Sequence, residues 1–237
     1  MSIYMWREYT WPELCFTANT AGSIIQLTKV WSPTVVTLET STDWDTWSAY
    51  SIWTTITLSN IWDKLYFRNT STTTTQFNDN SNEYKFVMNW SIAASWDITY
   101  LVNKNGTKDI SWCWAWCFVD LFNGCTALTS CPTLNATTLS NYCYYQLFYN
   151  CNNLETLPRL PATTIPDWPY QSIFKWCSKI KISSTQTWAY QTPYRIPIEW
   201  TWTAGSYWND SMFYGTWWTF QSNPSLNTTY YTSNTLV

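Results

Sequence analysis

Few residues of this 237-residue chain could carry out catalysis. It contains no histidine, which removes the commonest general base and every catalytic triad that depends on imidazole. Its 15 Asp and Glu residues are scattered without a shared motif, and no phosphate-binding loop, dinucleotide fingerprint or nucleophile elbow occurs. We therefore expect no enzyme and no cofactor. A hydrolase would need two of these carboxylates to meet in a cleft.

Eight cysteines are the other candidates for chemistry: Cys15, Cys113, Cys117, Cys125, Cys131, Cys143, Cys151 and Cys177. An even number invites disulfides in an exported protein, and grouped thiolates can also bind zinc. Zinc is the weaker interpretation, because histidine is absent and a repeat explains several of the positions, so we predict no metal site. A disulfide that involves Cys113, Cys117 or Cys131 stays open.

That repeat occupies the second half of the chain and has a period of 26 residues. Three columns of structural residues define it: Phe122, Phe148 and Phe174; Cys125, Cys151 and Cys177; and Leu128, Leu154 and Ile180. The period falls within the leucine-rich-repeat range. One unit cannot bury its apolar side alone, so the copies must stack. The cysteine column would then be buried, with the thiols acting as small apolar groups.

Each unit of the repeat should hold two short elements. We predict a short helix or turn, such as Asn141 to Tyr149, and then a short strand near Leu154 to Leu160. A fainter fourth copy begins at Met212, after a degenerate run from Ser183 to Asn209. The solenoid of short helices and strands is expected to end or to be interrupted in that run.

Tryptophan is unusually frequent, with 20 residues against only 5 glycines. Many of the tryptophans stand where a turn is expected, and a turn that needs a positive φ accepts glycine readily but a bulky aromatic only with strain. These predicted turn positions are Trp31, Trp44, Trp53, Trp62, Trp90 and Trp96. Trp176 also stands in a repeat column that otherwise holds Gly124, Asn150 and Gly215.

We hypothesise that most of these tryptophans are glycines in the source, where the codon UGA is read as Gly and not as Trp. Trp47 is expected to be genuine, because it lies in a strand-like, aromatic context. The alternative is that all 20 are genuine and form an aromatic binding surface. In a structure of the literal sequence, the hypothesis predicts exposed indoles at tight turns.

The first half of the chain is β-rich. Seven short runs are predicted as strands: Ile24 to Lys29, Pro33 to Glu39, Ser48 to Ile52, Thr55 to Leu58, Lys64 to Asn69, Tyr84 to Met88 and Ile98 to Val102. Their spacing is typical of a small β-sandwich. The loop Thr70 to Asn82 is polar, and its end, Asn78 to Glu83, carries oxygens of the kind Ca²⁺ prefers, although a solvated loop is the favoured interpretation.

Composition narrows the possible partners. The net charge is −3, and the only basic cluster, Lys175, Lys179 and Lys181, is too small to follow a phosphate backbone, so nucleic acid is not expected. No run of about 18 apolar residues predicts a membrane span. Abundant Thr, Ser and Asn favour a secreted or surface β protein, yet Met1 to Arg7 lack the apolar core of a signal peptide. A fragment, or a lost signal, is the expectation that follows.

The segment from Ala136 to Leu154 resembles the repeats of BspA-like leucine-rich-repeat surface proteins, and Phe16 to Met88 resembles the β module that can precede them. The resemblance implies export, surface display and adhesion or partner binding. Pro169 departs from it in a cysteine column. The expected function is a non-catalytic cell-surface adhesion or interaction protein that binds a protein or glycan ligand through its repeats. The alternative is a carbohydrate-binding module that uses exposed Trp.

Three regions are expected from these patterns. They are an N-terminal extension (residues 1–15), a β-sandwich-like module (16–108) and a leucine-rich-repeat region (109–237) that is degenerate after residue 183. The end, Asn234 to Val237, has no obvious polar cap, so the chain is expected to be truncated there.

Overall fold

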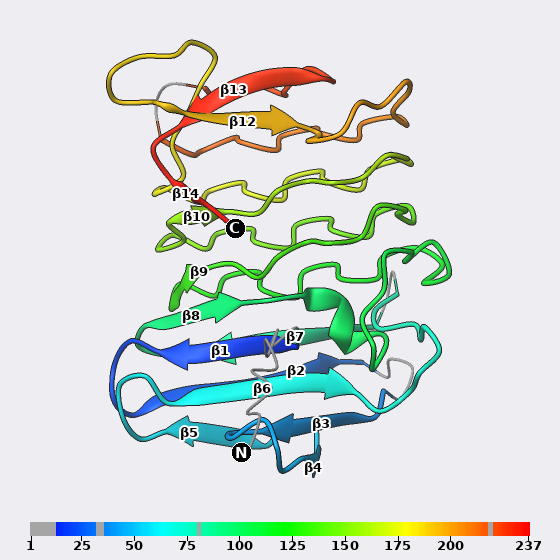
Figure 1. The fold of residues 1–237 in the computed structure, drawn as a ribbon, viewed down its shortest axis with the longest axis vertical. Coiled ribbons are helices and arrows are strands. Elements are labelled where there is room, and N and C mark those ends of the chain that lie inside the picture. The colour runs from blue at the N-terminus through cyan, green and yellow to red at the C-terminus, as the bar shows by residue number, and fades with distance from the viewer. Residues whose placement is uncertain (1–12, 32–35, 80–81, 218–219) are drawn as a thin grey trace, which may run out of the picture.

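The computed structural model describes residues 13–31, 36–79, 82–217 and 220–237, and the chain is mainly β (Figure 1). Most of the predicted N-terminal extension, the start of the predicted strand Pro33 to Glu39, and positions 80 and 81 lie outside the described residues. No helix in the described residues is long and apolar enough to cross a membrane.

Two sheets form the N-terminal part. The larger has the order β4-β3-β6-β1-β8-β9, and the smaller has the order β5-β2-β7. Their strands are β1 (Leu14–Ala18), β2 (Ser23–Val30), β3 (Leu38–Ser41), β4 (Ser48–Tyr50), β5 (Thr55–Leu58), β6 (Lys64–Asn69), β7 (Glu83–Met88), β8 (Ile92–Ser95) and β9 (Leu128–Ser130). The rings of Phe16 and Phe67 in the larger sheet meet Phe86 of the smaller at 4.9 and 5.4 Å between centroids. Aromatic packing therefore joins the two sheets.

Sequence patterns located most of these strands. The predicted runs Thr55 to Leu58 and Lys64 to Asn69 coincide with β5 and β6. The run Ile98 to Val102 was wrong as a strand. It forms the 3₁₀ helix η1 (Ile98–Leu101), because the Asp97 carboxylate accepts a hydrogen bond from the main-chain N–H of Thr99 at 2.9 Å and caps the turn.

The copies of the repeat stack on one another, but their predicted short helices are absent from the described residues. Residues 142–150 form consecutive turns. In the first copy, the N–H groups of Phe118 and Phe122 donate to the carbonyls of Cys143 and Leu147, while those of Leu121 and Cys125 donate back three residues. Every second N–H is thus satisfied by the next copy, so a helix is not needed to pair the main chain.

This arrangement gives five such bonds between each pair of adjacent copies, and it extends to the fourth copy, where the Trp176 N–H donates to the Tyr214 carbonyl at 2.9 Å. Rings stack along the same direction. Phe122, Phe148, Phe174 and Phe213 have centroid separations of 5.6, 5.9 and 5.7 Å, with the ring planes within 14° of parallel. Three of the four copies follow at the predicted period, and Phe213 of the fourth comes 39 residues after Phe174, so about 13 extra residues lie within the segment 183–206.

The remaining strands are short and lie in the upper part of Figure 1: β10 (Thr156–Leu157), β11 (Ile182–Ser183), β12 (Thr192–Ile196), β13 (Thr228–Thr232) and β14 (Thr235–Leu236). The predicted strand Leu154 to Leu160 is reduced to β10. The degenerate run contains β12, which joins β13 and β11 in a sheet of order β11-β13-β12, while β14 pairs in parallel with β10. The C-terminal segment therefore returns to the middle of the stack.

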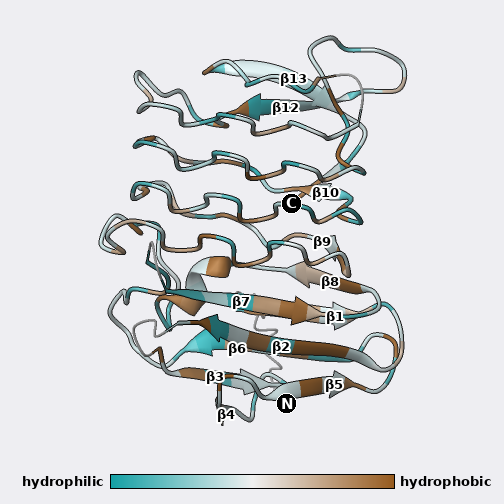
Figure 2. Cartoon of the chain, turned by 180° about the vertical axis from the view of Figure 1, so that it is seen from behind, coloured by the Kyte–Doolittle hydropathy of each residue, from teal (hydrophilic) through white to brown (hydrophobic). Residues whose placement is uncertain are grey.

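One apolar core runs through both halves of the molecule. It crosses the predicted boundary at residues 108 and 109, since Phe86 of β7 stacks on Phe122 at 5.2 Å and β8 pairs with β9. Seen from behind, the strands of the N-terminal part carry long hydrophobic stretches, whereas the stacked copies alternate short hydrophobic and hydrophilic segments (Figure 2). The first copy of the repeat thus continues the N-terminal β structure directly.

Tryptophan occupies an unusual part of the backbone map. All six predicted turn positions have positive φ: Trp31 (63°), Trp44 (69°), Trp53 (74°), Trp62 (74°), Trp90 (61°) and Trp96 (65°). Trp176 has a φ of 65°, and the other members of its column, Gly124, Asn150 and Gly215, are also positive. The prediction that these residues stand at turns of glycine-like geometry is confirmed.

Candidate binding groove

An open groove of about 720 Å³ crosses the strand side of the stacked copies. One end is formed by Asn19, after β1, and Ala93 in β8. The groove continues over β9 and β10 and reaches the segment before β11 and the β13–β14 turn. Residues far apart in sequence therefore share one surface because each copy contributes the same short stretch next to the last.

Hydroxyl and amide side chains make up much of the lining. The Asn19 side-chain amide nitrogen donates to Thr129 Oγ1 at 2.9 Å. This bond also sets the orientation of the Asn19 side-chain oxygen. The Thr156 hydroxyl accepts from the main-chain N–H of Cys131 at 2.8 Å. These contacts hold the side chains in place, so the groove presents an ordered set of polar atoms to a ligand.

The charges in the groove are few. Lys179 Nζ lies 2.6 Å from Glu155 Oε1, and both side chains are about half exposed, so this ion pair adds little to stability. Lys181 Nζ lies 5.8 Å from the centre of the Trp217 ring, in a cation–π arrangement. Within the described residues no carboxylate is paired with Lys181, which leaves its ammonium for an anionic or hydroxyl-rich ligand.

Asn234 closes the groove at the C-terminal segment. Its amide nitrogen donates to the main-chain carbonyls of Glu155 and Lys179, at 2.9 and 3.0 Å, and its carbonyl oxygen accepts from the Lys181 N–H at 2.7 Å. One buried side chain thus connects the second copy, the third copy and the chain end. The positions of Lys179 and Lys181 depend on this contact.

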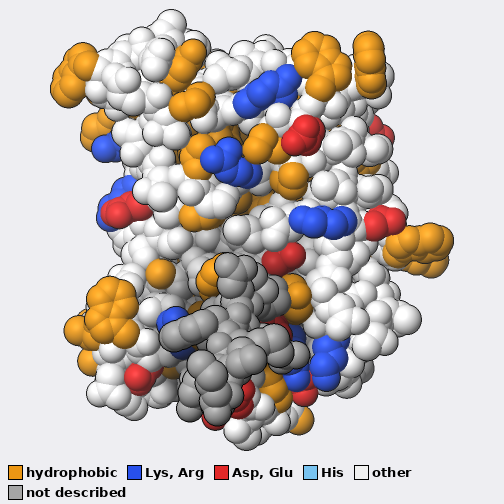
Figure 3. All heavy atoms as spheres, viewed as in Figure 1, with side chains coloured by type: hydrophobic (Ala, Val, Ile, Leu, Met, Phe, Trp, Pro, Cys, Tyr) orange, Lys and Arg blue, Asp and Glu red, His pale blue; other side chains and the backbone are white. Residues whose placement is uncertain are grey.

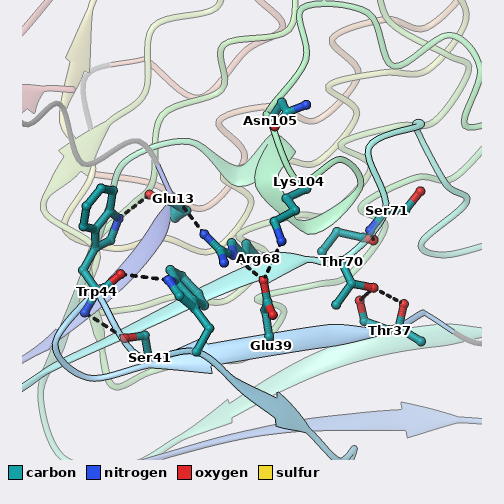
Figure 4. Close-up of polar contacts among 12 residues, drawn as sticks. Glu13, Thr37, Glu39, Ser41, Trp44, Arg68, Thr70, Ser71, Lys104 and Asn105 are labelled. Atoms are coloured by element: carbon teal, nitrogen blue, oxygen red, sulfur yellow. Dashed lines mark hydrogen bonds and ion pairs between the residues drawn. The ribbon is translucent and has the colours of Figure 1, made fainter.

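The pair of carboxylates with the most contacts lies elsewhere, on the N-terminal part (Figure 4). Arg68 in β6 stands between Glu39 in β3, 2.5 Å away, and Glu13, 3.6 Å away. Lys104 also pairs with Glu39 at 3.4 Å, and the Trp44 Nε1–H donates to Glu13 at 2.7 Å. Because each carboxylate contacts a cation, the cluster ties β3 and β6 to the residue that precedes β1.

A second acidic group borders the first copy. Desolvation raises the pKa of Glu83 to about 7, with help from the charges of Asp120 and Asp79 and against the effect of Lys85. Burial also raises the pKa of Asp120. The Asn78 side-chain oxygen, a candidate Ca²⁺ ligand, instead accepts from the Tyr84 N–H at 2.7 Å, so it holds the loop and is not free for a cation.

The described cysteines are all free thiols, and all eight are buried. The thiols of Cys125, Cys151 and Cys177 donate to the carbonyls of Phe86, Phe122 and Phe148 at 3.0, 3.0 and 2.9 Å. The predicted buried column is confirmed. In the described residues no group of three His, Cys, Asp or Glu side chains is placed to hold a metal ion.

The other predicted structural columns are buried as well. The Phe column and the column of Leu128, Leu154 and Ile180 are inaccessible to solvent. These residues hold the copies together and do not touch the groove. Of the groove residues, the sequence indicated only Lys179 and Lys181, as a small basic cluster. The repeat could have indicated some of the other groove residues. Thr129 and Glu155 stand one period apart, so stacked copies place them side by side.

The surface agrees with the weak charge of the sequence. In Figure 3, Lys and Arg side chains are spread among uncharged polar atoms and neighbouring Asp and Glu. Several hydrophobic side chains protrude at the margins of this face.

No family model, curated protein or solved structure matches the chain.

Proposed function

We propose that this chain is a non-catalytic cell-surface adhesion or interaction protein, a β-sandwich-like module followed by a leucine-rich-repeat solenoid similar to those of BspA-like proteins. In this proposal the protein acts outside the cell and binds a protein or glycan ligand on another surface. The groove over β9, β10 and the β13–β14 turn is its binding surface. The groove itself is the observation that carries the proposal.

Three properties of the groove support binding and not catalysis. It is open and elongated, and it crosses several copies, which suits an extended ligand better than a small enclosed substrate. Its hydroxyl and amide atoms are held in fixed positions by hydrogen bonds to the main chain or to neighbouring side chains. Its single carboxylate, Glu155, is paired with Lys179 and has no second acid beside it in the described lining.

A binding experiment tests this proposal. The purified protein is applied to arrays of immobilised glycans and extracellular-matrix proteins, and the variant Lys181→Glu is compared with Lys29→Glu, which changes an exposed lysine of β2 outside the groove. We expect Lys181→Glu to weaken binding by about tenfold or more, because a charge-assisted contact is worth about 1.5–3 kcal/mol. Equal binding by both variants would argue against the groove.

The alternative function is a carbohydrate-binding module that uses exposed tryptophans. One observation favours it: Trp62 and Trp90 are 73% and 67% exposed and lie in neighbouring turns beside the β1–β2 turn, where the Trp62 N–H donates to Ala18 and the Asn19 N–H donates to Ser91. Two open rings at one end could stack on sugars. This function exists only if both residues are tryptophan in the native protein.

A further inference from the structure

Backbone geometry separates the tryptophans into two groups. Among the described tryptophans ten have positive φ, and in nine of them φ lies between 61° and 74°: Trp31, Trp44, Trp53, Trp62, Trp90, Trp96, Trp116, Trp168 and Trp176. The four glycines with positive φ span 66° to 78°. Four of the nine tryptophans fall within the glycine range, and the other five lie within 5° of its lower edge.

The other residue types with positive φ behave differently. In the part of the chain that the structure describes, eight residues that are neither Gly nor Trp also have positive φ, and their values span only 49° to 58°. This is the left-handed region that L-residues can enter, close to its ideal value near 57°. The nine tryptophans lie beyond that range without overlap. Their φ values are therefore displaced from this group toward those of the glycines.

None of these tryptophans is a core residue, although Trp116 and Trp168 stack on Tyr142 and Trp44 donates to Glu13. Trp31, Trp53, Trp62 and Trp90 are between 54% and 79% exposed, and none of the nine is buried. A large aromatic residue is usually retained for the apolar area that it buries. At these four exposed positions the strained backbone is not accompanied by burial, so packing does not explain the residue type.

Two tryptophans show the opposite pattern. Trp208 is only 8% exposed and belongs to the core. The Trp47 ring lies 3.6 Å from the Arg68 guanidinium, and its Nε1–H donates to the Trp44 carbonyl at 2.8 Å. Neither residue has positive φ. Both have the contacts and the backbone expected of a selected tryptophan.

We propose that the nine residues are glycine in the native protein, encoded by UGA in a genetic code that reads this codon as Gly, and that Trp47 and Trp208 are true tryptophans encoded by UGG. This inference does not depend on the proposed function. It also changes the surface, because Tyr142, now stacked between Trp116 at 3.8 Å and Trp168 at 5.5 Å, would have both ring faces uncovered.

The coding DNA and the native protein together test the proposal. We expect TGA at the nine positions, TGG at positions 47 and 208, and peptide masses from the protein of the source cells that show Gly at the nine. TGG at the nine positions would overturn the assignment. So would TGA with peptides that contain Trp, since that codon would then be read as tryptophan. TGA at positions 47 and 208 would show that backbone geometry does not distinguish true tryptophans from recoded glycines.

Discussion

The thiol of Cys151 donates a hydrogen bond to the main-chain carbonyl of Phe122 in the preceding copy, with 3.0 Å between Sγ and O. The same bond joins Cys177 to Phe148 and Cys125 to Phe86. Each copy is thereby fixed to the one before it by a buried polar contact beside the stacked phenylalanine rings. The cysteine column has a structural role that a reactive or bridged thiol could not fill.

Replacing Cys151 by alanine should lower the free energy of unfolding by about 1–3 kcal/mol, because the Phe122 carbonyl loses its thiol partner and a small cavity remains. Chemical denaturation measures this change. Thr163→Ala is a suitable control, since the Thr163 hydroxyl makes only an exposed hydrogen bond to the Thr137 carbonyl. A Cys151→Ala protein as stable as the parent would contradict the structural role.

All eight thiols should be unreactive in the folded protein and reactive after unfolding. Burial raises the pKa of Cys125 and of Cys131 to about 12, so neither forms a thiolate near neutral pH. Titration with a thiol-specific reagent, with and without denaturant and in the absence of reductant, counts them. Fewer than eight reactive thiols in denaturant would reveal a disulfide and contradict the free state of the cysteines.

Replacing Trp62 by glycine in a protein made from an all-UGG gene should raise the free energy of unfolding by about 1 kcal/mol, because a strained positive φ is relieved at an exposed site. The matched variant Trp47→Gly should lower it by about 1–2 kcal/mol, since the contact with Arg68 is lost. Thermal or chemical unfolding compares the two. A loss of stability in Trp62→Gly would show that its indole stabilises the fold.

Stability should fall as the pH rises through the range set by Glu83. The folded carboxyl keeps its proton up to a pKa of about 7, whereas the unfolded residue loses it near the ordinary value of 4.5. Between these values the folded state binds more protons, so its advantage is complete below pH 4.5 and is lost as the pH passes about 7. Burial of Asp120 acts in the same direction.

Unfolding measured across this pH range for Glu83→Gln should show a flatter profile than the parent. Glu155→Gln is the control, because Glu155 is exposed and has an oppositely charged neighbour, Lys179. If the parent and Glu83→Gln profiles run parallel, Glu83 is not the group that titrates.

Replacing Asn234 by alanine should release the C-terminal strand from the stack. The change removes four hydrogen bonds, three with the main chain of Glu155, Lys179 and Lys181 and one from the Thr232 hydroxyl. Hydrogen exchange at the amides of Lys181 and Val237 should become faster while that of Phe148 stays slow. Uniform acceleration would indicate global loss of stability and no local clamp.

Local patterns were sufficient for the strands of the N-terminal part, because β5 and β6 are β-rich runs bounded by turn residues. They failed at Ile98 to Val102, whose composition favours a strand. The backbone there forms a 3₁₀ helix because Asp97 caps its N-terminus. For each repeat unit they predicted a short helix or a turn, and the turn forms, since the N–H of a residue such as Phe122 finds its acceptor in another copy. The sequence of a single repeat unit does not show that its N–H groups bond to carbonyls of the next copy.

The groove was largely beyond prediction from the sequence. Its lysines were visible as a cluster, but Asn19 and Asn234 reach it from opposite ends of the chain. They lie in the groove because strands far apart in the sequence pair with each other, such as β10 with β14. The positive φ of the tryptophans, in contrast, was predictable, because turn position follows from short-range sequence.

The main-chain bonds between copies point along the stack, and this has a mechanical consequence. Tension applied between the N-terminal part and the last copy would act along these bonds, and the C-terminal segment would share the load between the second and third copies, since Asn234 bonds to both. At one interface the five bonds share that force. We expect a pulled molecule to lengthen in separate steps, one copy at a time, and to stay attached between steps.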